Sequence, residues 1–391
     1  MQQDPQNAAD PALASASPGP GELVLLGAGL AHVQVLAQLA RRALPGVRIT
    51  LVAPHAQLLY APQLSGFVAG RHALEDGAIA LEPLVRQSGV RWLQRSVRAL
   101  DAQAQEVLLD DGSSLRYDWL SVNTGPVHNR ALLDIGIPGI RENGLFVRPL
   151  DSFAALWPKV AALGDQQALR LAVVGQGAAG VELAFAVRQR LPNAAITLIG
   201  PQPVGADLPA QAQAMLTRAL RARRITVLTD RVVRVDRDEL TLGSGARLAS
   251  NVSLVALGPQ APLWLQGSGL ALDAQGFIAV NACQQSTSHP KVLAAGDVSS
   301  RTDAPHAAPP RHAASALQVG PALAHNLTQL LSGLPLRERP PARRRLQLLP
   351  LSDGRALIVW GRLIELGRLA AWFKRWRDRR TVARLRAGKP L

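Results

Sequence analysis

The amino-acid sequence predicts an α/β protein with two Rossmann-like domains, the second inserted into the first, and a small C-terminal region that ends in a basic amphipathic helix. Three observations support this prediction: two glycine-rich turns about 150 residues apart, a later Gly-Asp turn after another apolar run, and a change to Arg-rich composition near the C-terminus. The expected boundaries are a disordered leader at 1–20, the first domain at 21–150 and 271–335, the inserted domain at 151–270, and the C-terminal region at 336–391.

The first glycine-rich turn has the sequence LVLLGAGLAH at residues 23–32. Its glycines suit a strand–turn–helix unit that binds a pyrophosphate, because Gly27 permits the tight turn and Gly29 lets the backbone approach the phosphates at the positive end of the helix dipole. The third glycine of the pattern is replaced by His32, whose imidazole either packs between helix and sheet or reaches the ligand; packing is the favoured role.

The second turn, LAVVGQGAAGVE at residues 171–182, keeps all three glycines, Gly175, Gly177 and Gly180. Two such turns, each on its own strand and helix, predict that one chain binds two dinucleotides. The strands that follow them, 47–52 and 194–199, do not end in the acidic residue that binds a ribose hydroxyl, because Ala-Pro and Gly-Pro come next. FAD is not excluded from the first site, and the choice between NADH and NADPH at the second stays open.

The remaining elements expected in the two domains follow from local pattern. They are, in chain order, a β-hairpin at 107–118, a strand that ends in Asn123-Thr124-Gly125, a helix at 210–222, strands at 226–228 and 252–257, a turn at Gly296-Asp297 and a small-residue helix at 313–331.

Composition narrows the chemistry. Cys283 is the only cysteine of the 391 residues, which excludes a disulfide framework, a cysteine zinc site and an intramolecular redox dithiol. The eight His lack any metal-ligand spacing, so we expect no metal site. No apolar run reaches the ~18–20 residues that span a bilayer, and the leader lacks the features of a signal peptide. We expect a cytoplasmic protein, on the inner face of the cytoplasmic membrane if its C-terminus binds lipid. The oligomeric state is open, a homodimer included.

The C-terminal region carries most of the positive charge. Residues 337–391 contain fourteen Arg and two Lys against four acidic residues, a net charge of +12 out of +15 for the whole chain. After a Pro/Arg connector at 335–345 and a hairpin at 346–359, residues 366–386 are expected to form a basic helix with one apolar face, made of Leu369, Trp372, Phe373 and Trp376. Residues 366–391 suit an anionic membrane surface or a partner; the alternative is that the apolar face packs on the protein itself. We expect no nucleic-acid binding, because no recognised nucleic-acid fold accompanies the charge.

With these motifs in this order, the chain resembles the two-dinucleotide-binding flavoprotein superfamily, and within it the type II NADH dehydrogenase-like branch, over residues 21–386. It is most similar to the flavoprotein module found fused to selenide, water dikinase, on the stretches LLGAGLAHVQV at 25–35, QLSGFVAG at 63–70, GPALAHNL at 320–327 and WFKRWRDRR at 372–380. The resemblance implies FAD in the outer domain and NADH or NADPH bound over the flavin by the inserted domain.

The resemblance also assigns roles to residues. For FAD it implies a pyrophosphate loop of Gly27, Ala28, Gly29 and His32, a small-residue turn of Asn123, Thr124 and Gly125, and contact of Gly296 and Asp297 with the ribityl chain. For the nicotinamide dinucleotide it implies Gly175, Gly177, Gly180, Glu182 and Gly258. It implies no catalytic residue, because the cofactors carry the chemistry.

One departure from the family concerns the electron acceptor. Type II dehydrogenases carry a glutamine pair on the helix under the flavin, close to the quinone, whereas this chain has Gln318 in one position and Ala314 in the other. The departure opens an alternative, in which Arg311 and His312 face the flavin edge and bind a more polar or anionic acceptor.

The sequence therefore predicts an FAD-dependent NAD(P)H oxidoreductase that passes electrons to an acceptor other than a dithiol, either a quinone or another small acceptor. Two alternatives remain: a reductase that serves selenium metabolism, and a non-catalytic FAD-bearing redox sensor or scaffold that binds a partner through its tail.

Overall fold

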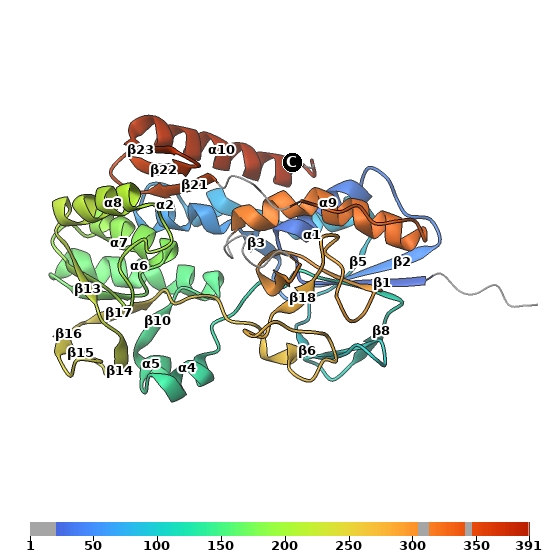
Figure 1. Ribbon diagram of the computed structural model, residues 1–391, viewed down its shortest axis with the longest axis horizontal. Helices are drawn as coiled ribbons and strands as arrows, with labels where there is room; N and C mark the ends of the chain where they lie inside the picture. Colours follow the sequence, from blue (N-terminus) through green and yellow to red (C-terminus); the bar gives the residue numbers. More distant parts are fainter. Residues whose placement is uncertain (1–20, 304–312, 341–345, 390) are drawn as a thin grey trace, which may run out of the picture.

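The computed structural model of the protein describes residues 21–303, 313–340, 346–389 and 391 (Figure 1). It contains two five-stranded sheets, and every strand pair within each of them is parallel. Each sheet is built around one of the two glycine-rich turns. The predicted α/β class is confirmed.

The first sheet has the strand order β19-β9-β1-β2-β5. Its strands are β1 (Gly21–Leu26), β2 (Val47–Val52), β5 (Arg91–Leu93), β9 (Trp119–Val122) and β19 (Val292–Ala294). Because β19 pairs with β9, the chain leaves this sheet, builds the second one and then returns.

The first sheet is buried on both faces. Helices α1 (Leu30–Leu39), α3 (Leu81–Ser88) and α9 (Ala313–Leu331) pack together over one face. Leu25 belongs to this core and Leu26 to the core on the opposite face, since successive side chains of a strand point to opposite faces. The continuous apolar run of β1 is what two buried faces require.

Small β elements cover the other face of the first sheet. They are the antiparallel sheet of β6 (Val97–Asp101), β7 (Glu106–Leu109) and β8 (Ser114–Arg116), and the parallel pair of β18 (Ile278–Val280) and β20 (Ser299–Arg301). The hairpin predicted at 107–118 is formed by β7 and β8.

A chain of short elements between β2 and β5 lies at the seam with the second unit, where α2 packs against α7. These elements are β3 (Gln57–Leu59), η1 (Ala61–Gln63), α2 (Leu64–Val68), η2 (Leu74–Gly77) and β4 (Ala78–Ala80).

The second sheet has the order β10-β17-β11-β12-β13. Its strands are β10 (Gly144–Phe146), β11 (Arg170–Val174), β12 (Ala195–Gly200), β13 (Ile225–Thr229) and β17 (Val252–Val255). One face packs on α6 (Leu150–Gln166), α7 (Ala178–Arg190) and α8 (Ala210–Ala222), and the other on α4 (Arg130–Gly136), α5 (Ile140–Asn143), β14 (Val232–Val235), β15 (Glu239–Leu242) and β16 (Arg247–Ala249).

One strand of the second sheet lies inside the range expected for the first domain. β10 falls within 21–150 but pairs with β17 of the second sheet, so the first unit ends before residue 144. A three-residue strand has no periodicity to read in the sequence, so local pattern alone does not assign β10 to the second sheet.

The C-terminal region is an antiparallel sheet followed by a long helix. β21 (Leu346–Pro350), β22 (Ala356–Trp360) and β23 (Leu363–Gly367) lead into α10 (Arg368–Arg386). The hairpin is confirmed, but β23 was not predicted, and the helix begins at Arg368 instead of Leu366. α10 runs across the top of both units (Figure 1) and contacts β22 and β4.

Candidate dinucleotide and electron-transfer site

The first glycine-rich turn is closed by contacts within the protein. Gly27 has φ +85°, a conformation that favours glycine, and its N–H donates to Val52 O at 2.8 Å. The Gly29 N–H donates to Asn123 O at 3.1 Å, and a Cβ on Gly29 would overlap Asn123. Both glycines are required by the close approach of the residues that follow β9, because a Cβ on Gly27 would overlap Asn123 and Thr124.

Asn123 joins the three signatures of the first unit. Its side-chain oxygen accepts the N–H groups of Ala31 at 3.0 Å and His32 at 3.1 Å, and its amide nitrogen donates to Ala295 O at 2.6 Å. The side chain is therefore buried and used by the protein, whereas Gly125, two residues on, faces open space. In this turn the ligand-facing positions are those after Asn123.

His32 fills the gap between α1 and β9. The residue is 0% exposed, and its Nδ1 lies 2.5 Å from Gly27 O and its Nε2 2.8 Å from Ser121 Oγ. Because a carbonyl only accepts, Nδ1–H is the donor and Nε2 accepts from the Ser121 hydroxyl. Burial lowers the pKa of His32 to about 4, so the ring is neutral. These contacts support the packing role over contact with the ligand.

Asp297 lies in η4 (Gly296–Val298), directly after β19. Arg148 is close enough to feel its charge: burial lowers the pKa of Arg148, and the carboxylate of Asp297 opposes that shift. Sequence reasoning missed Arg148, whose only signal was a lone basic residue in the run FVRPL at 146–150. Together the two residues place an acid and a base at the end of β19.

The second glycine-rich turn is more open than the first. The Gly175 N–H donates to Ile199 O at 2.7 Å, and a Cβ on Gly180 would overlap the Gly175 carbonyl. Gly177, by contrast, faces open space. No side chain of the described ranges caps the first turn of α7. The N–H groups at this helix start are available to a phosphate.

The side chain of Gln176, from the second glycine-rich turn, lies against the end of β12, where Gly200 stands in place of the expected acidic residue. Its amide nitrogen donates to Leu228 O at 2.6 Å and Leu198 O at 3.2 Å. A Cβ on Gly200 would come within 2.9 Å of the Gln176 side chain. The missing ribose-binding acid thus has a steric reason, because Gln176 covers the end of that strand.

Glu182 of α7 faces a buried polar cluster shared by three parts of the chain. Lys374 and Asp378 of α10 are 7% and 3% exposed, and Lys374 Nζ donates to Asp378 at 2.7 Å and to Pro62 O at 2.8 Å. The Tyr60 hydroxyl donates to Asp378 at 3.3 Å. Burial raises the pKa of Glu182 to about 7, and Lys374 opposes this shift. Glu182 can therefore hold or release a proton near neutral pH.

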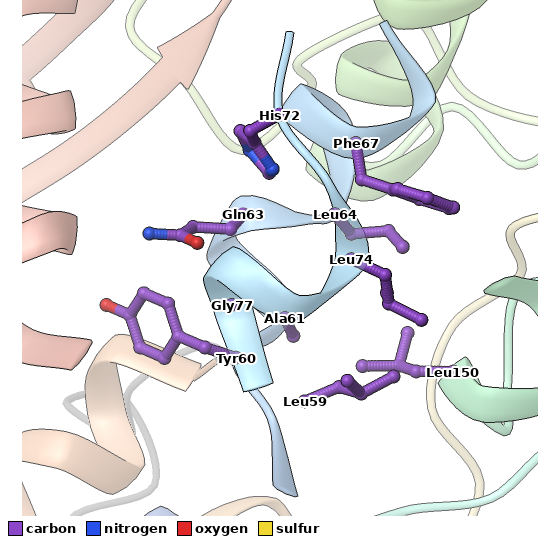
Figure 2. Close-up of a pocket in the computed structure, with 10 residues that line it drawn as sticks. All are labelled: Leu59, Tyr60, Ala61, Gln63, Leu64, Phe67, His72, Leu74, Gly77 and Leu150. Atoms are coloured by element: carbon purple, nitrogen blue, oxygen red, sulfur yellow. The ribbon is translucent and has the colours of Figure 1, made fainter. Parts of the chain in front are cut away.

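A small cavity lies beside this cluster, between residues 59–77 and α6. In Figure 2 the side chains of Leu59 and Phe67 point to the same side as Leu150, which belongs to α6, while those of Tyr60 and Gln63 point to the opposite side. The cavity measures about 20 Å³, room for one or two water molecules and no substrate. Sequence reasoning singled out residues 63–70 of this segment for a family resemblance but gave no role to residues 57–62, QLLYAP, which carry no glycine or charge pattern.

The outer face of α10 is exposed. Leu369 is 76%, Trp372 58% and Trp376 45% exposed, and the two indole rings stack with centroids 6.4 Å apart. The inner face contains the buried residues Ala370, Ala371, Lys374, Asp378 and Leu385. The alternative in which the aromatic face packs on the protein's own body is therefore wrong.

The other predicted site residues lie in three places. Gly258 faces open space in the connector after β17. Gln318 of α9 is exposed, and its side-chain oxygen accepts from Arg339 at 3.3 Å. Arg311 and His312 lie outside the described residues. Across the ranges that the structure describes, no group of three or more His, Cys, Asp or Glu could hold a metal ion. None of the helices in those ranges is long and apolar enough to cross a bilayer.

Comparison with known proteins places this geometry. The model of the pyridine nucleotide-disulphide oxidoreductase family matches residues 21–328. Demethylphylloquinone reductase NdbB of Synechocystis sp. is 27% identical over 332 residues, 80% of either chain. The ferredoxin–NAD(+) reductase component of the p-cumate 2,3-dioxygenase system of Pseudomonas putida is 30% identical over 287 residues, 72% of this chain and 68% of that one. The structure of the sulfide:quinone oxidoreductase from Aquifex aeolicus has a TM-score of 0.77 at 16% identity and covers 94% of this chain and 92% of that one.

Proposed function

Because the chain belongs to the pyridine nucleotide-disulphide oxidoreductase family, we propose that it is an NAD(P)H:quinone oxidoreductase that works at a membrane surface. The family confirms the expected enzyme class and its cofactors, FAD and a nicotinamide dinucleotide. These cofactors, when bound, supply hydride transfer from nicotinamide to flavin. Cys283 is the only cysteine, so the electrons cannot leave through a protein dithiol and require a separate acceptor.

The residues present fit both cofactors. In the first unit, the backbone about Gly27 and Gly29 and the open space at Gly125 suit FAD, and Asp297 with Arg148 would bind its polar chain. In the second unit, Gly177 and Gly258 face open space, and the uncapped start of α7 suits the phosphates of NADH or NADPH.

Glu182 supports reduction of a quinone. A hydride brings two electrons and one proton, so a quinone that becomes a quinol takes a second proton from the protein or from water. With a pKa of about 7, Glu182 can hold that proton at neutral pH, and Lys374 stabilises the carboxylate after the proton has left.

The observation that carries the proposal is the two-sided character of α10. Its inner face contacts Tyr60 and lies near Glu182, beside the second glycine-rich turn, while its outer face exposes Trp372 and Trp376. A basic helix with outward aromatic rings suits the headgroup region of an anionic bilayer, where a lipid-soluble quinone is available. The relative from Synechocystis is a demethylphylloquinone reductase.

The first test is an anaerobic titration of the purified protein with NADH and then NADPH, followed by a short-chain quinone. We expect the visible flavin absorbance to bleach with a nicotinamide and to return with the quinone. Bleaching by a nicotinamide without return of the absorbance on adding the quinone would keep the dehydrogenase assignment and reject a quinone as the acceptor. Bound flavin that neither nucleotide bleaches would reject the proposal and favour the redox sensor or scaffold.

A second test addresses the membrane. Trp372→Ala/Trp376→Ala should reduce co-sedimentation with anionic liposomes about ten-fold or more, because each buried indole contributes roughly 2 kcal/mol. The matched control is Ile135→Ala, which removes an even more exposed apolar side chain from α4, away from α10. Equal loss in the control, or no loss in the double variant, would contradict a membrane role for α10.

A second acceptor class is supported by one comparison. The Pseudomonas putida relative is a ferredoxin–NAD(+) reductase component, and an acidic iron–sulfur protein would be attracted by the Arg-rich C-terminal region. Reduction of such a protein should fall steeply with salt, whereas reduction of a neutral quinone should not. A role in selenium metabolism remains a third proposal, which faster flavin reoxidation by an oxidised selenium compound than by a quinone would support.

A further inference from the structure

We propose that Asn123 is a positioning residue that makes FAD the resident cofactor of this enzyme: its side chain caps α1 and holds the phosphate loop in its binding shape, which slows FAD release. The inference deepens the proposed function, since it rests on FAD being bound at the first turn. Asn123 acts on FAD through the loop, because its side chain is buried and its polar atoms are all hydrogen-bonded within the protein.

The first step of the argument is the start of α1. A helix start leaves N–H groups without intrahelical partners, and a phosphate commonly completes them. Here the Asn123 oxygen accepts the N–H groups of Ala31 and His32. The bond from its amide nitrogen to Ala295 O then ties the helix start to the end of β19, next to Gly296. The protein itself completes the loop before any ligand enters.

The second step concerns the residue two positions earlier. Ser121 and Asn123 lie on the same side of the strand, because side chains alternate along it. The Ser121 hydroxyl donates to His32 Nε2 at 2.8 Å, and Nδ1–H of the same ring donates to Gly27 O. His32, the departure from the glycine pattern, is thus matched by two polar residues on the neighbouring strand.

The third step is the counterpart in the second unit. β9 lies beside β1 in the register Leu26 with Val122, and β17 lies beside β11 in the register Val174 with Val255. The residue equivalent to Asn123 is therefore Ala256, and its N–H makes the equivalent bond, to Val174 O at 2.9 Å. The positions of Ser121 and His32 are filled by Leu254 and Gly180. None of these three residues has a side-chain acceptor that could cap α7, so the second turn is left for its ligand to complete.

The consequence is a division of labour between two sites of similar shape. A loop that is already held in its bound conformation loses less conformational freedom when the ligand binds, which favours tight binding and slow release. A loop without such support binds more weakly and releases faster, as a substrate such as NADH must. Asn123 is the residue that sets this difference.

The test uses the FAD-loaded, full-length protein and its Asn123→Ala variant. The rate of FAD release is followed by the rise of flavin fluorescence after dilution, and NADH affinity by titration. We expect release to become about ten-fold faster or more, from the loss of a helix cap and a buried hydrogen bond, with NADH affinity unchanged within about two-fold. A release rate within two-fold of wild type would overturn the proposal, as would equal weakening at both sites.

A second variant and a second readout keep the test decisive if Asn123→Ala folds poorly. Asn123→Asp has the same shape and keeps both bonds to the helix start, but it cannot donate to Ala295 O. Hydrogen exchange of the peptide that contains Ala31 and His32 should stay slow in Asn123→Asp and become fast in Asn123→Ala; equal exchange in the two variants would contradict the proposal. A wild-type protein that binds no FAD would instead reject the first site itself, and so the proposed function.

Discussion

The two glycine-rich turns share one strand–turn–helix shape but differ in what completes it. In the first, the Asn123 side chain accepts two N–H groups at the start of the helix; in the second, Ala256 stands at the same place and has no side-chain acceptor to offer. The glycines decide where a phosphate can approach. The neighbouring strand decides whether the protein or the ligand satisfies the start of the helix.

The largest expected effect comes from substituting the second glycine of each turn, Gly29 in the first and Gly177 in the second. Gly29→Ala should destabilise the protein by about 3 kcal/mol or more, because the new Cβ overlaps the backbone and side chain of Asn123. Gly177→Ala should change stability by less than about 0.5 kcal/mol, because no atom lies near its Cβ. Thermal unfolding of both variants measures the difference.

Binding provides the converse measurement for this pair. Gly177→Ala should weaken the binding of NADH, since the new methyl group enters the space left for the ligand. A comparable loss of stability in the two variants would remove the distinction between a filled and an open turn.

The next effect is acid sensitivity of the first turn. Burial lowers the pKa of His32 from 6.5 to about 4, so the unfolded chain takes up the proton first. The neutral ring makes its full contribution to the free energy of unfolding above pH 6.5. This contribution is lost as the pH falls toward 4, by about 3 kcal/mol in all. Denaturant unfolding between pH 7 and pH 4 measures this. His32→Asn, which can still donate to Gly27 O, should flatten the slope; a slope equal to wild type would assign the acid sensitivity to other groups.

The second unit should show the opposite pH dependence. Burial raises the pKa of Glu182 from 4.5 to about 7, so the folded state favours the protonated carboxyl. Its contribution is full below pH 4.5 and is lost as the pH rises to 7. Glu182→Gln should therefore be more stable than wild type by roughly 1–3 kcal/mol at pH 8 and equal to it at pH 4. A stabilisation by Glu182→Gln that is greater at pH 4 than at pH 8 would contradict the burial of this carboxyl.

The smallest effect tests whether the second turn can be converted toward the first. Ala256→Asn should place an acceptor beside the N–H groups of Ala179 and Gly180 and slow NADH release a few-fold, roughly 0.5–1 kcal/mol. Stopped-flow displacement of NADH measures the rate. Unchanged release would contradict the view that an acceptor at this position sets the release rate.

Local pattern was enough to predict the two sheets, their central strands and the helices at 210–222 and 313–331, because glycine turns and apolar runs are read within a few residues. The capping of α1 by Asn123 depends on a register between strands far apart in the chain, which no single segment encodes. The same holds for Lys374, which in the sequence is one of many basic residues of the predicted amphipathic helix. Its burial follows from contact with Pro62 and Asp378 once α10 has docked.

The return of β19 to the first sheet sets the order in which the newborn chain can fold. β9 keeps an unpaired edge until residues 292–294 have been made, and Tyr60 waits for a partner 318 residues downstream. At roughly 5–20 residues per second, the ribosome leaves that edge uncovered for on the order of ten seconds or more, while the inserted unit is completed first. The nascent chain thus depends most on protection from aggregation while its middle is being translated.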